Sequence, residues 1–405
     1  MKNIVIVSGA RTPIGTFMGS LKDHSASDLG ALAIKEALIR ANMNPEEIDE
    51  VVFGCIGQVA EDAYVARVAA VKAGIPIESS AMTINRLCAS GVQSIITAAM
   101  EIQCGAAEIV VAGGTESMTN YQYYLRKARS GYKFGDGVLQ DGLTATLNDP
   151  FSGLQMGVTA ENIAEKFGIT RKEQDEFAYE SQKKAAYAMD KNLFEEEILP
   201  IEVKINKNET RIFKTDEHPR PQTTIEKLSN LKAVFKEGGT VTPGNSSGIN
   251  DGAAAVVLMS EEKAKEKGLK PIIRIVDSCV AGVDPGIMGT GPIPAVRKLL
   301  QKTEIKLDEI GLVELNEAFA AQSIACIREL GLDMNKINVN GGAIALGHPL
   351  GATGAILTVK LMHDMKRKGI RYGLETLCIG GGQGLAVIYE LIQEYNEYEL
   401  KTPSM

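Results

Sequence analysis

The chain of 405 residues carries 43 lysines and arginines against 51 aspartates and glutamates, which gives a formal net charge of −8 at pH 7. With 44% hydrophobic and 23% charged residues, its composition is that of a globular protein and excludes the disordered, collagenous and coiled-coil classes. An acidic chain of this length is enough for two or three domains, and it lacks the overall attraction that nucleic acids and anionic membranes require, so we expect neither as a partner.

Residues 3–9 form a short apolar run that breaks at Gly9, Arg11 and Pro13. No small-residue cleavage pattern follows, so the run predicts a first β-strand rather than a signal peptide. The six cysteines form no C-x-x-C pair, which favours free thiols and a reducing, cytoplasmic location. No pair of cysteines has zinc-ligand spacing, and we expect no metal site.

Two parts of the chain share one rhythm of short apolar runs and helical patterns. The runs lie at 3–9, 50–57, 81–91 and 108–114, and again at 271–278, 310–319, 337–354 and 372–390. Alternation of short strands with helices of ten or more residues predicts parallel or mixed sheets covered by helices on both faces. We therefore expect an α/β protein built from two similar halves.

The sequence between the halves has a different composition, rich in tyrosine, lysine and glycine. Thr170 and Glu173 form a capping box that predicts a helix over 172–189. The apolar segment 245–260 then supplies a last strand for the first half. We predict three units: residues 1–120 with 245–270, an inserted domain at 121–244, and a second half at 271–395.

Cys88 lies where an apolar strand turns into an apolar helix. At a helix N-terminus, unpaired N–H groups and the helix dipole lower a thiol pKa from about 8.5 and can donate to an oxyanion. This placement predicts a nucleophile with a lowered pKa. The alternative interpretation is a small buried core residue.

His348 lies in an uncharged, glycine-rich segment between Gly347 and Pro349. A histidine held in this way can accept a proton from a thiol or a substrate. It could instead be a core histidine bonded to a carbonyl, or one end of a phosphate-binding loop. The other three histidines, in polar contexts, are expected to be solvated: His24, His218 and His363.

Cys378 ends a strand and precedes three glycines, whose N–H groups could bind an oxyanion or a phosphate. A nucleotide loop is disfavoured because the segment continues as a strand and no helix follows. Asn316 ends another strand at the start of a helix, where an N-cap is the alternative interpretation. Together with Cys88 and His348, these residues are expected at the sheet edge where open α/β sheets carry their sites.

Five motifs of the chain resemble the motif series of the thiolases, in the same order and over essentially its whole length. They are NRLCASG (85–91), GNSSGINDGAA (244–254), NEAFA (316–320), NGGAIALGHPLGATG (340–354) and CIGGGQG (378–384). The resemblance implies duplicated βαβαβ halves in a layered α-β-α-β-α sandwich with an inserted loop subdomain. Ketoacyl-carrier-protein synthases share that fold with a Cys-His-His or Cys-His-Asn set, and the second cysteine favours a thiolase.

The resemblance also implies roles for the site residues. Cys88 would carry the acyl group, His348 would accept its proton, and Cys378 would act as acid and base at the substrate. Backbone N–H groups of Cys88 and Gly380 would bind one oxyanion, and His348 with a water held by Asn316 the other. The implied reaction is reversible condensation of two acetyl-CoA to acetoacetyl-CoA, or thiolysis of 3-ketoacyl-CoA.

Coenzyme A would then be a substrate, and no separate cofactor is implied. Its phosphates would bind local cations in the inserted domain, with Arg220 as the first candidate. The matching family positions for coenzyme A are Ser247, Arg220, Phe235, Met156 and Phe319. Short-chain acetoacetyl-CoA thiolases often carry histidine where this chain has Gln155, so longer or branched substrates stay open.

Two other functions stay open at this point. One is a decarboxylating condensing enzyme acting on carrier-protein thioesters, and the other is a non-catalytic CoA-binding protein. The resemblance further implies a role in fatty acid metabolism and a homotetramer or homodimer. Residues 120–135, rich in tyrosine and lysine, are the candidate association loop.

Overall fold

The computed structural model describes residues 2–392. Residues 393–395, which the sequence analysis assigns to the second half, lie outside this range. None of the helices in residues 2–392 is both long and apolar enough to cross a membrane.

The first half of the chain builds a sheet in the order β4-β3-β5-β10-β1. Its strands are β1 (Ile4–Arg11), β3 (Glu50–Gly54), β4 (Ser80–Ile84), β5 (Ile109–Ser117) and β10 (Asn250–Ser260), with the short β2 (Gly15–Thr16) paired to β10. β3 runs parallel to β4 and β5, whereas β10 is antiparallel to both β5 and β1. The expected last strand of this half is therefore a central one, buried along its whole length.

The second half builds a sheet in the order β12-β13-β14-β11. Its strands are β11 (Ile273–Gly282), β12 (Ile310–Leu315), β13 (Tyr372–Ile379) and β14 (Gln383–Leu391). Only β12 and β13 are parallel, and the other pairs are antiparallel. β1 also pairs with β11, Val5 with Arg274 and Ile6 with Ile273, so the two sheets join at this edge.

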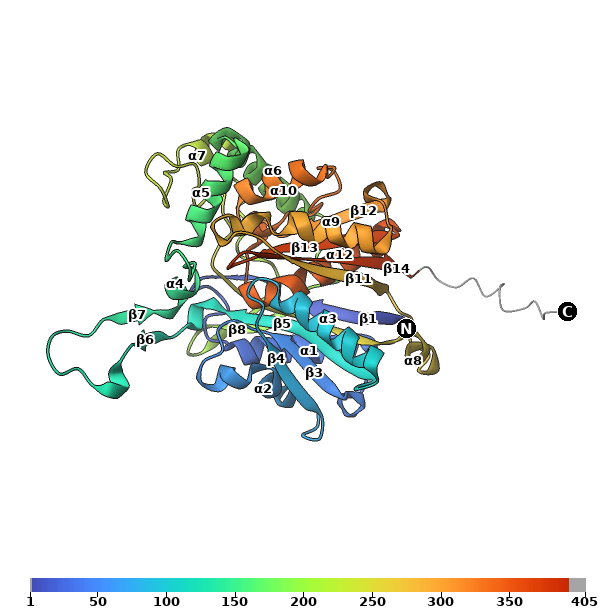
Figure 1. The fold of residues 1–405 in the computed structure, drawn as a ribbon. Coiled ribbons are helices and arrows are strands. Elements are labelled where there is room, and N and C mark those ends of the chain that lie inside the picture. The colour runs from blue at the N-terminus through green and yellow to red at the C-terminus, as the bar shows by residue number, and fades with distance from the viewer. Residues whose placement is uncertain (1, 393–405) are drawn as a thin grey trace.

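Helices form three layers around the two sheets (Figure 1). α3 (Ser90–Cys104) and α12 (Leu350–Lys368) lie between the sheets, α1 (Ala26–Ala41) and α2 (Val65–Lys72) cover the first, and α9 (Pro292–Thr303) and α10 (Ala320–Leu330) lie over the second. α12 contacts strands of both sheets, so apolar side chains are buried all around it. This arrangement confirms the layered α-β-α-β-α sandwich.

One expected strand is missing. The run beginning at Ile337 makes a single parallel bridge to Val313 and no strand. Asn338 has a left-handed backbone (φ 43°), which ends extended pairing. Its side chain takes the place of a neighbouring strand, because the amide accepts from Leu315 N–H and donates to Leu315 C=O, both at 2.9 Å. A side chain can satisfy a backbone edge in a way that hydrophobic patterning does not reveal.

The inserted segment lies beside the second half and also forms an arm. Its elements are β6 (Tyr123–Leu125), β7 (Leu139–Asp141), α4 (Gly142–Thr146), α5 (Met156–Phe167), α6 (Arg171–Asp190), β8 (Ile201–Asn206), β9 (Glu209–Phe213) and α7 (Ile225–Ser229). β6 and β7 pair and project from the body (Figure 1). Thr170 and Glu173 make the capping box of α6, as predicted. The remaining α-helices are α8 (Glu261–Glu266) and α11 (Ala343–Leu346).

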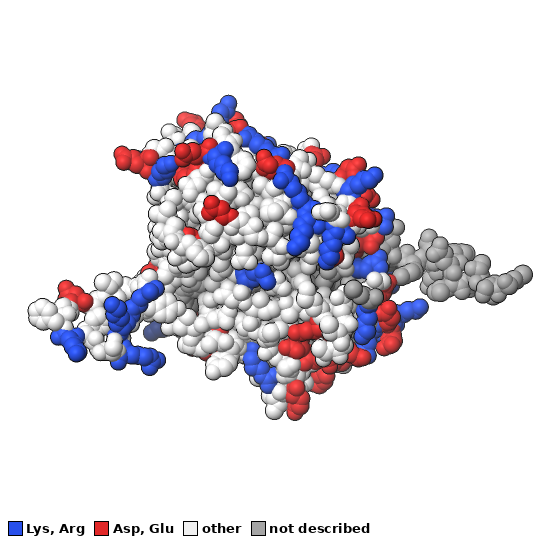
Figure 2. All heavy atoms as spheres, in the orientation of Figure 1, with Lys and Arg blue, Asp and Glu red and all other residues white. Residues whose placement is uncertain are grey.

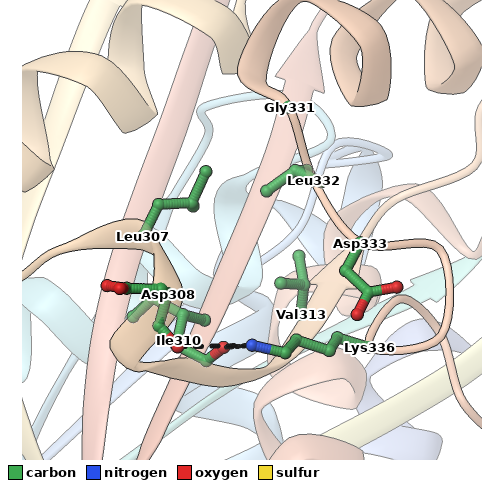
Figure 3. A pocket seen from close by; sticks show the side chains of 8 residues that line it. All are labelled: Leu307, Asp308, Ile310, Val313, Gly331, Leu332, Asp333 and Lys336. Atoms are coloured by element: carbon green, nitrogen blue, oxygen red, sulfur yellow. Dashed lines mark hydrogen bonds between the residues drawn. The ribbon is translucent and has the colours of Figure 1, made fainter.

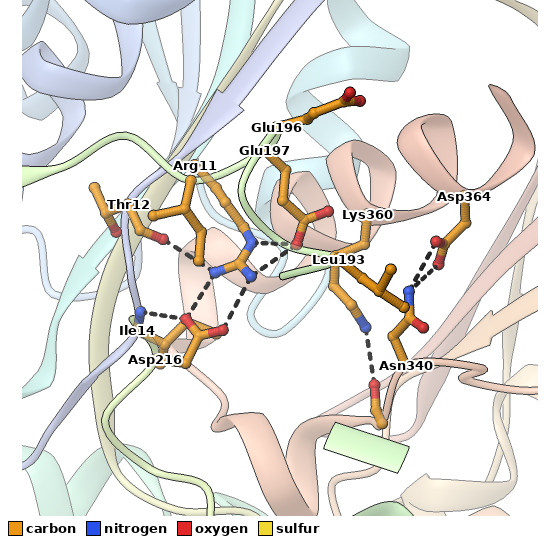
Figure 4. Close-up of polar contacts among 12 residues, drawn as sticks. Arg11, Thr12, Ile14, Leu193, Glu196, Glu197, Asp216, Asn340, Lys360 and Asp364 are labelled. Carbon is orange, nitrogen blue, oxygen red and sulfur yellow. Dashed lines mark hydrogen bonds and ion pairs between the residues drawn. The ribbon is translucent and has the colours of Figure 1, made fainter. Parts of the chain in front are cut away.

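Buried ion pairs tie the insert to β1 and tie α12 to β12, and Figure 4 shows the contacts of Arg11 and Lys360. Arg11, at the end of β1, is fully buried and bonds Glu197 and Asp216 of the insert at 2.7 Å each. On α12, Lys360 bonds Glu314 of β12 at 3.0 Å and the carbonyl of Gly341 at 2.9 Å. Because each charge has partners, these pairs hold the segments in register.

Candidate active site

Cys88 lies in a tight turn between β4 and α3. Leu87 has a left-handed backbone (φ 46°), a conformation that costs a non-glycine residue about 1–2 kcal/mol. The Ser90 hydroxyl holds the turn, because it accepts from Arg86 N–H at 2.9 Å and donates to Leu87 C=O at 2.6 Å. The turn therefore presents Cys88 at the N-terminal end of α3, where the sequence places it.

The thiol of Cys88 is neutral in this setting. Burial raises its pKa to about 11, although the backbone N–H of Gly380 donates to the sulfur and acts in the opposite direction. The expected lowering of this pKa by the helix N-terminus is therefore wrong. The desolvation of the thiolate outweighs the backbone N–H groups of Gly380 and Cys88, which favour it.

His348 is held from three sides at the start of α12. Its backbone N–H donates to Asn250 Oδ1 at 3.0 Å, and its Nδ1 lies 2.6 Å from Thr353 Oγ1. Its Nε2 lies 3.4 Å from Asn316 Nδ2. The side chain is buried, which lowers its pKa to about 4, so the imidazole is neutral at pH 7 and free to accept a proton.

Asn316 follows β12 and faces His348. Its backbone N–H donates to Thr376 C=O at 3.0 Å, which fixes it to β13. The capping interpretation is wrong, since α10 begins at Ala320 and its N-cap is Phe319. Within residues 2–392, Asn316 Oδ1 is buried without a hydrogen-bond partner. A buried acceptor of this kind can hold a water or a substrate group.

Cys378 is the second thiol at this edge. It is fully buried near the end of β13, and burial together with the nearby Cys88 raises its pKa well above the ordinary value. The next glycines form the turn of a hairpin, because Ile379 pairs with Gln383 at the start of β14. The hairpin explains why this segment is not a nucleotide loop, and it directs Gly380 N–H at Cys88.

Glycines bring the N-terminal ends of α3 and α12 together. A Cβ on Gly91 would lie 2.6 Å from Ala355 N and 3.0 Å from Gly351 O, and one on Gly354 would lie 2.5 Å from Val92 N. Such distances are too short for any side chain. Because Cys88 and His348 each precede one of these helices by two residues, the close packing places them at the same edge.

Three of the residues expected to contact coenzyme A lie beside this edge. Met156 and Phe319 pack against the small apolar cluster that contains Cys378. A Cβ on Gly380 would lie 3.2 Å from the Met156 methyl group. Phe235 and Phe319 meet edge to face, with ring centroids 6.3 Å apart. Together they form an apolar wall that leads from the thiols into the insert.

Ser247 lies next to this wall, and Arg220 lies beside α6. The backbone N–H of Ser247 donates to Ala318 C=O at 3.0 Å, next to Phe319. Arg220 is exposed, and its backbone N–H donates to Gln182 Oε1 of α6 at 2.8 Å. The exposed guanidinium is available to an anion, and no carboxylate within residues 2–392 forms an ion pair with it.

Glu116 is a buried residue that sequence reasoning missed. Its carboxylate accepts from Gly57 N–H at 2.9 Å, Ile56 N–H at 3.1 Å and Gly351 N–H at 2.8 Å. It therefore connects β5 to the first turn of α12, directly after His348. The signal was available: a carboxylate at the end of an apolar strand needs several donors in the fold. Asn250 and Thr353 were missed in the same way.

The other histidines differ from expectation. His24, His218 and His363 are partly buried rather than solvated. Burial lowers the pKa of His218 and of His363 to about 4 in each case. His218 lies 3.4 Å from Asn250, so it packs behind the residue that anchors His348. The polar sequence around these histidines did not reveal the covering segments.

A separate surface cavity of about 450 Å³ lies at the opposite end of β12 from Asn316 (Figure 3). Its polar rim contains Lys336, whose ammonium group donates to the backbone carbonyls of Asp308 at 3.3 Å and Ile310 at 2.8 Å. None of the residues lining this cavity belongs to the site at Cys88.

Comparisons with known proteins cover the whole fold. The family described as "Thiolase, N-terminal domain" matches residues 4–262, and "Thiolase, C-terminal domain" matches residues 269–391. An acetyl-CoA acetyltransferase of Syntrophomonas wolfei is 49% identical over 96% of this chain and 100% of its own length. The structure of the Bacillus anthracis acetyl-CoA acetyltransferase superposes with a TM-score of 0.95 and 48% identity, over 97% of this chain and 99% of that one. Human mitochondrial 3-ketoacyl-CoA thiolase in complex with CoA gives a TM-score of 0.93 at 46% identity, over 96% and 98%.

Proposed function

The chain belongs to the thiolase family, and we propose that it transfers acyl groups between coenzyme A thioesters through Cys88. The reaction is the reversible condensation of two acetyl-CoA to acetoacetyl-CoA, or the thiolysis of a 3-ketoacyl-CoA. The observation that carries the proposal is the meeting of two thiols, an imidazole and an unpartnered amide oxygen at one buried edge.

In the first half-reaction, the Cys88 thiol gives its proton to His348 as its sulfur attacks the thioester carbonyl. The carbonyl oxygen becomes an oxyanion, and the backbone N–H groups of Cys88 and Gly380 are the donors placed to stabilise it. The C–S bond to coenzyme A then breaks, and the departing thiolate takes the proton from His348. The product is an acyl-Cys88 thioester.

In the second half-reaction, Cys378 gives its thiol proton to the neutral His348, and the resulting Cys378 thiolate removes the α-proton of a second acyl-CoA. The carbanion attacks acyl-Cys88, forms the C–C bond and releases the Cys88 thiolate, which takes the proton back from His348. The enolate oxygen is stabilised by His348 and by a water bound to Asn316, whose unpartnered Oδ1 supports this role. Thiolysis is the same path in reverse, with Cys378 protonating the leaving enolate.

Coenzyme A extends from this edge into the insert. Its pantetheine arm follows the apolar side chains of Met156, Phe235 and Phe319, and its phosphates bind near Ser247 and the exposed Arg220. An acidic protein needs such a local cation because its overall charge repels the nucleotide. Coenzyme A serves as substrate and product, without a separate cofactor or metal.

The length of the acyl chain depends on the loop before α5. Gln155 is exposed at the N-cap of α5, next to Met156. An amide keeps a donor and an acceptor but has neither the ring nor the titration of an imidazole. The similar proteins include both an acetyl-CoA acetyltransferase and a 3-ketoacyl-CoA thiolase. Acetoacetyl-CoA and a longer 3-ketoacyl-CoA are therefore both substrates to test.

The protein is further proposed to act in the cytoplasm, in fatty acid metabolism, as a homotetramer or homodimer. The arm of β6 and β7 supports self-association. Its apolar side chains are exposed, among them Tyr123, Leu125 and Phe134. Figure 2 shows Lys and Arg side chains on the same arm. Apolar side chains on a projecting arm are typical of a contact with another copy.

The test is the loss of acetoacetyl-CoA enolate absorbance on adding free coenzyme A, beside a longer 3-ketoacyl-CoA. Cleavage of the short substrate identifies a short-chain thiolase, and cleavage of only the longer one identifies a 3-ketoacyl-CoA thiolase. Cys88→Ala should abolish both. Unchanged acyl transfer by Cys88→Ala, or activity only with malonyl carrier-protein thioesters, would contradict the proposal.

A further inference from the structure

The orientation of the His348 proton follows from a hydrogen-bond chain at the start of α12. His348 Nδ1 lies 2.6 Å from Thr353 Oγ1, and the same oxygen lies 2.9 Å from Pro349 C=O. Both His348 and Thr353 are buried. A threonine hydroxyl has one hydrogen to donate, whereas a carbonyl can only accept.

The hydrogens of this chain have one arrangement in which every contact is a donor facing an acceptor. Thr353 donates to Pro349 C=O and accepts from His348 Nδ1–H. The opposite ring nitrogen, Nε2, then carries a lone pair and accepts from Asn316 Nδ2, 3.4 Å away. With the proton on Nε2 instead, the bare Nδ1 would face Thr353 Oγ1, whose only hydrogen is already donated to Pro349 C=O. We propose that Thr353 is a positioning residue that fixes His348 in the Nδ1–H tautomer, leaving Nε2 as the base.

The fold makes Thr353 a rigid partner. Its hydroxyl bonds the carbonyl four residues earlier, a contact that a threonine in a helix makes within a restricted set of side-chain rotamers. The backbone of His348 is fixed separately, through its N–H to Asn250. The ring is therefore held at both its backbone and its far side, and the tautomer does not depend on the substrate.

This inference rests on the proposed function for its catalytic consequence. Nε2 accepts the Cys88 proton, and the imidazolium keeps Nδ1–H on Thr353 while Nε2–H returns the proton to the departing coenzyme A thiolate. Without the hydroxyl, Nδ1–H would be buried without an acceptor, so the neutral ring would carry its proton on Nε2. An imidazole protonated there has no lone pair facing the thiol.

The test reads the tautomer directly, by nitrogen NMR of protein labelled with ¹⁵N-histidine at pH 7. The chain has four histidines, and His348→Asn identifies the signals of His348. We expect Nδ1 protonated and Nε2 unprotonated in the wild type and in Thr353→Ser, and the reverse in Thr353→Val. A wild-type ring protonated at Nε2, or a Thr353→Val ring that keeps its proton on Nδ1, would overturn the proposal.

Kinetics supply the second measurement. Thr353→Val should lower kcat/KM for acyl transfer by about 10²-fold, the scale of a lost general base, and Thr353→Ser should recover most of it. Thr358→Val is the matched control, because Thr358 is a buried hydroxyl on the same helix that bonds Glu375 rather than His348. It should leave the His348 tautomer unchanged. The NMR result needs no turnover, so an inactive wild type would count against the proposed function and not against this tautomer.

Discussion

Cys88 and His348 are both uncharged before the substrate arrives. Burial raises the pKa of the thiol to about 11 and lowers that of the imidazole to about 4. This edge therefore stabilises the neutral thiol and imidazole rather than a thiolate–imidazolium pair. The proton moves to His348 as the attack on the substrate proceeds, when an oxyanion forms beside Gly380 N–H.

This neutrality predicts the pH dependence of alkylation at Cys88. The rate with iodoacetamide should rise steadily from pH 7 towards pH 10, because only the thiolate reacts and its fraction grows up to the pKa near 11. The measurement uses a Cys104→Ser background, since Cys104 is an exposed thiol. Acetyl-CoA should protect Cys88. A rate that is already constant between pH 7 and 8 would show an ionised thiol instead.

The residue types at the site could be predicted, but their environments could not. The sequence identified Cys88, His348, Asn316 and Cys378 because each ends or follows a strand or precedes a helix. It gave the wrong sign for the thiol pKa, since burial depends on segments distant in the chain. Glu116, Asn250 and Thr353 bond backbone groups or ring atoms that come together only in the fold.

At the scale of elements, the first sheet follows the predicted alternation, and the second loses one strand. The polar and glycine residues around Asn338 were compatible with a strand by rhythm alone. A left-handed Asn338 and its side-chain bonds to Leu315 replace that strand. Hydrophobic periodicity indicates which residues are buried. It does not indicate which group forms hydrogen bonds with the backbone N–H and C=O groups of an edge strand.

The contact between α3 and α12 predicts a specific sensitivity. Gly354→Ala should lower the free energy of unfolding by about 1–3 kcal/mol, because the new methyl group would meet backbone atoms of α3 that cannot yield without moving the helix. It should also reduce turnover, since the two helices position Cys88 and His348. Chemical denaturation and the thiolysis assay measure the two effects.

Gly282→Ala is the control for Gly354→Ala. A Cβ at Gly282 would have its nearest contact at 3.9 Å, and its φ is not left-handed. We expect its free energy of unfolding to change by less than about 0.5 kcal/mol, as for most substitutions away from packed sites. Equal stability of the two variants would show that the helices can separate without cost.

At the scale of the whole molecule, buried carboxylates between the layers make stability depend on pH. Burial raises the pKa of Glu314 to about 7, against the opposing effect of Lys360. Between its unfolded value of 4.5 and about 7, the folded state binds more protons than the unfolded chain. This carboxyl therefore contributes stability at low pH that is lost as the pH rises towards 7.

Glu314→Gln removes that titration. Relative to the wild type, the variant should lose less free energy of unfolding between pH 4.5 and pH 7, the range set by the two pKa values of Glu314. Urea denaturation at several pH values measures the difference. Glu329→Gln, on an exposed ion pair, should leave the wild-type slope unchanged. If the free energy of unfolding changed with pH equally in Glu314→Gln and the wild type, the raised pKa of Glu314 would be contradicted.

The arm of β6 and β7 predicts the behaviour of the protein in solution. Phe134 is fully exposed and Val138 largely so. Replacing both with aspartate should reduce the mass measured by light scattering, because charge in an apolar contact is costly. Ile77→Asp, an exposed apolar residue away from the arm, should not. An unchanged mass in the arm variant would place the contact elsewhere.

The two halves divide the chemistry between them. Cys88 belongs to the first half, and His348, Asn316 and Cys378 belong to the second, with α8 ending at Glu266 and β11 beginning at Ile273. A backbone break within 267–272 would leave the nucleophile on one polypeptide and its base on the other. Neither fragment would hold a complete site, so turnover would report their reassembly. In genetic terms, the two halves are mutually dependent parts, and neither is active unless the other is present and intact.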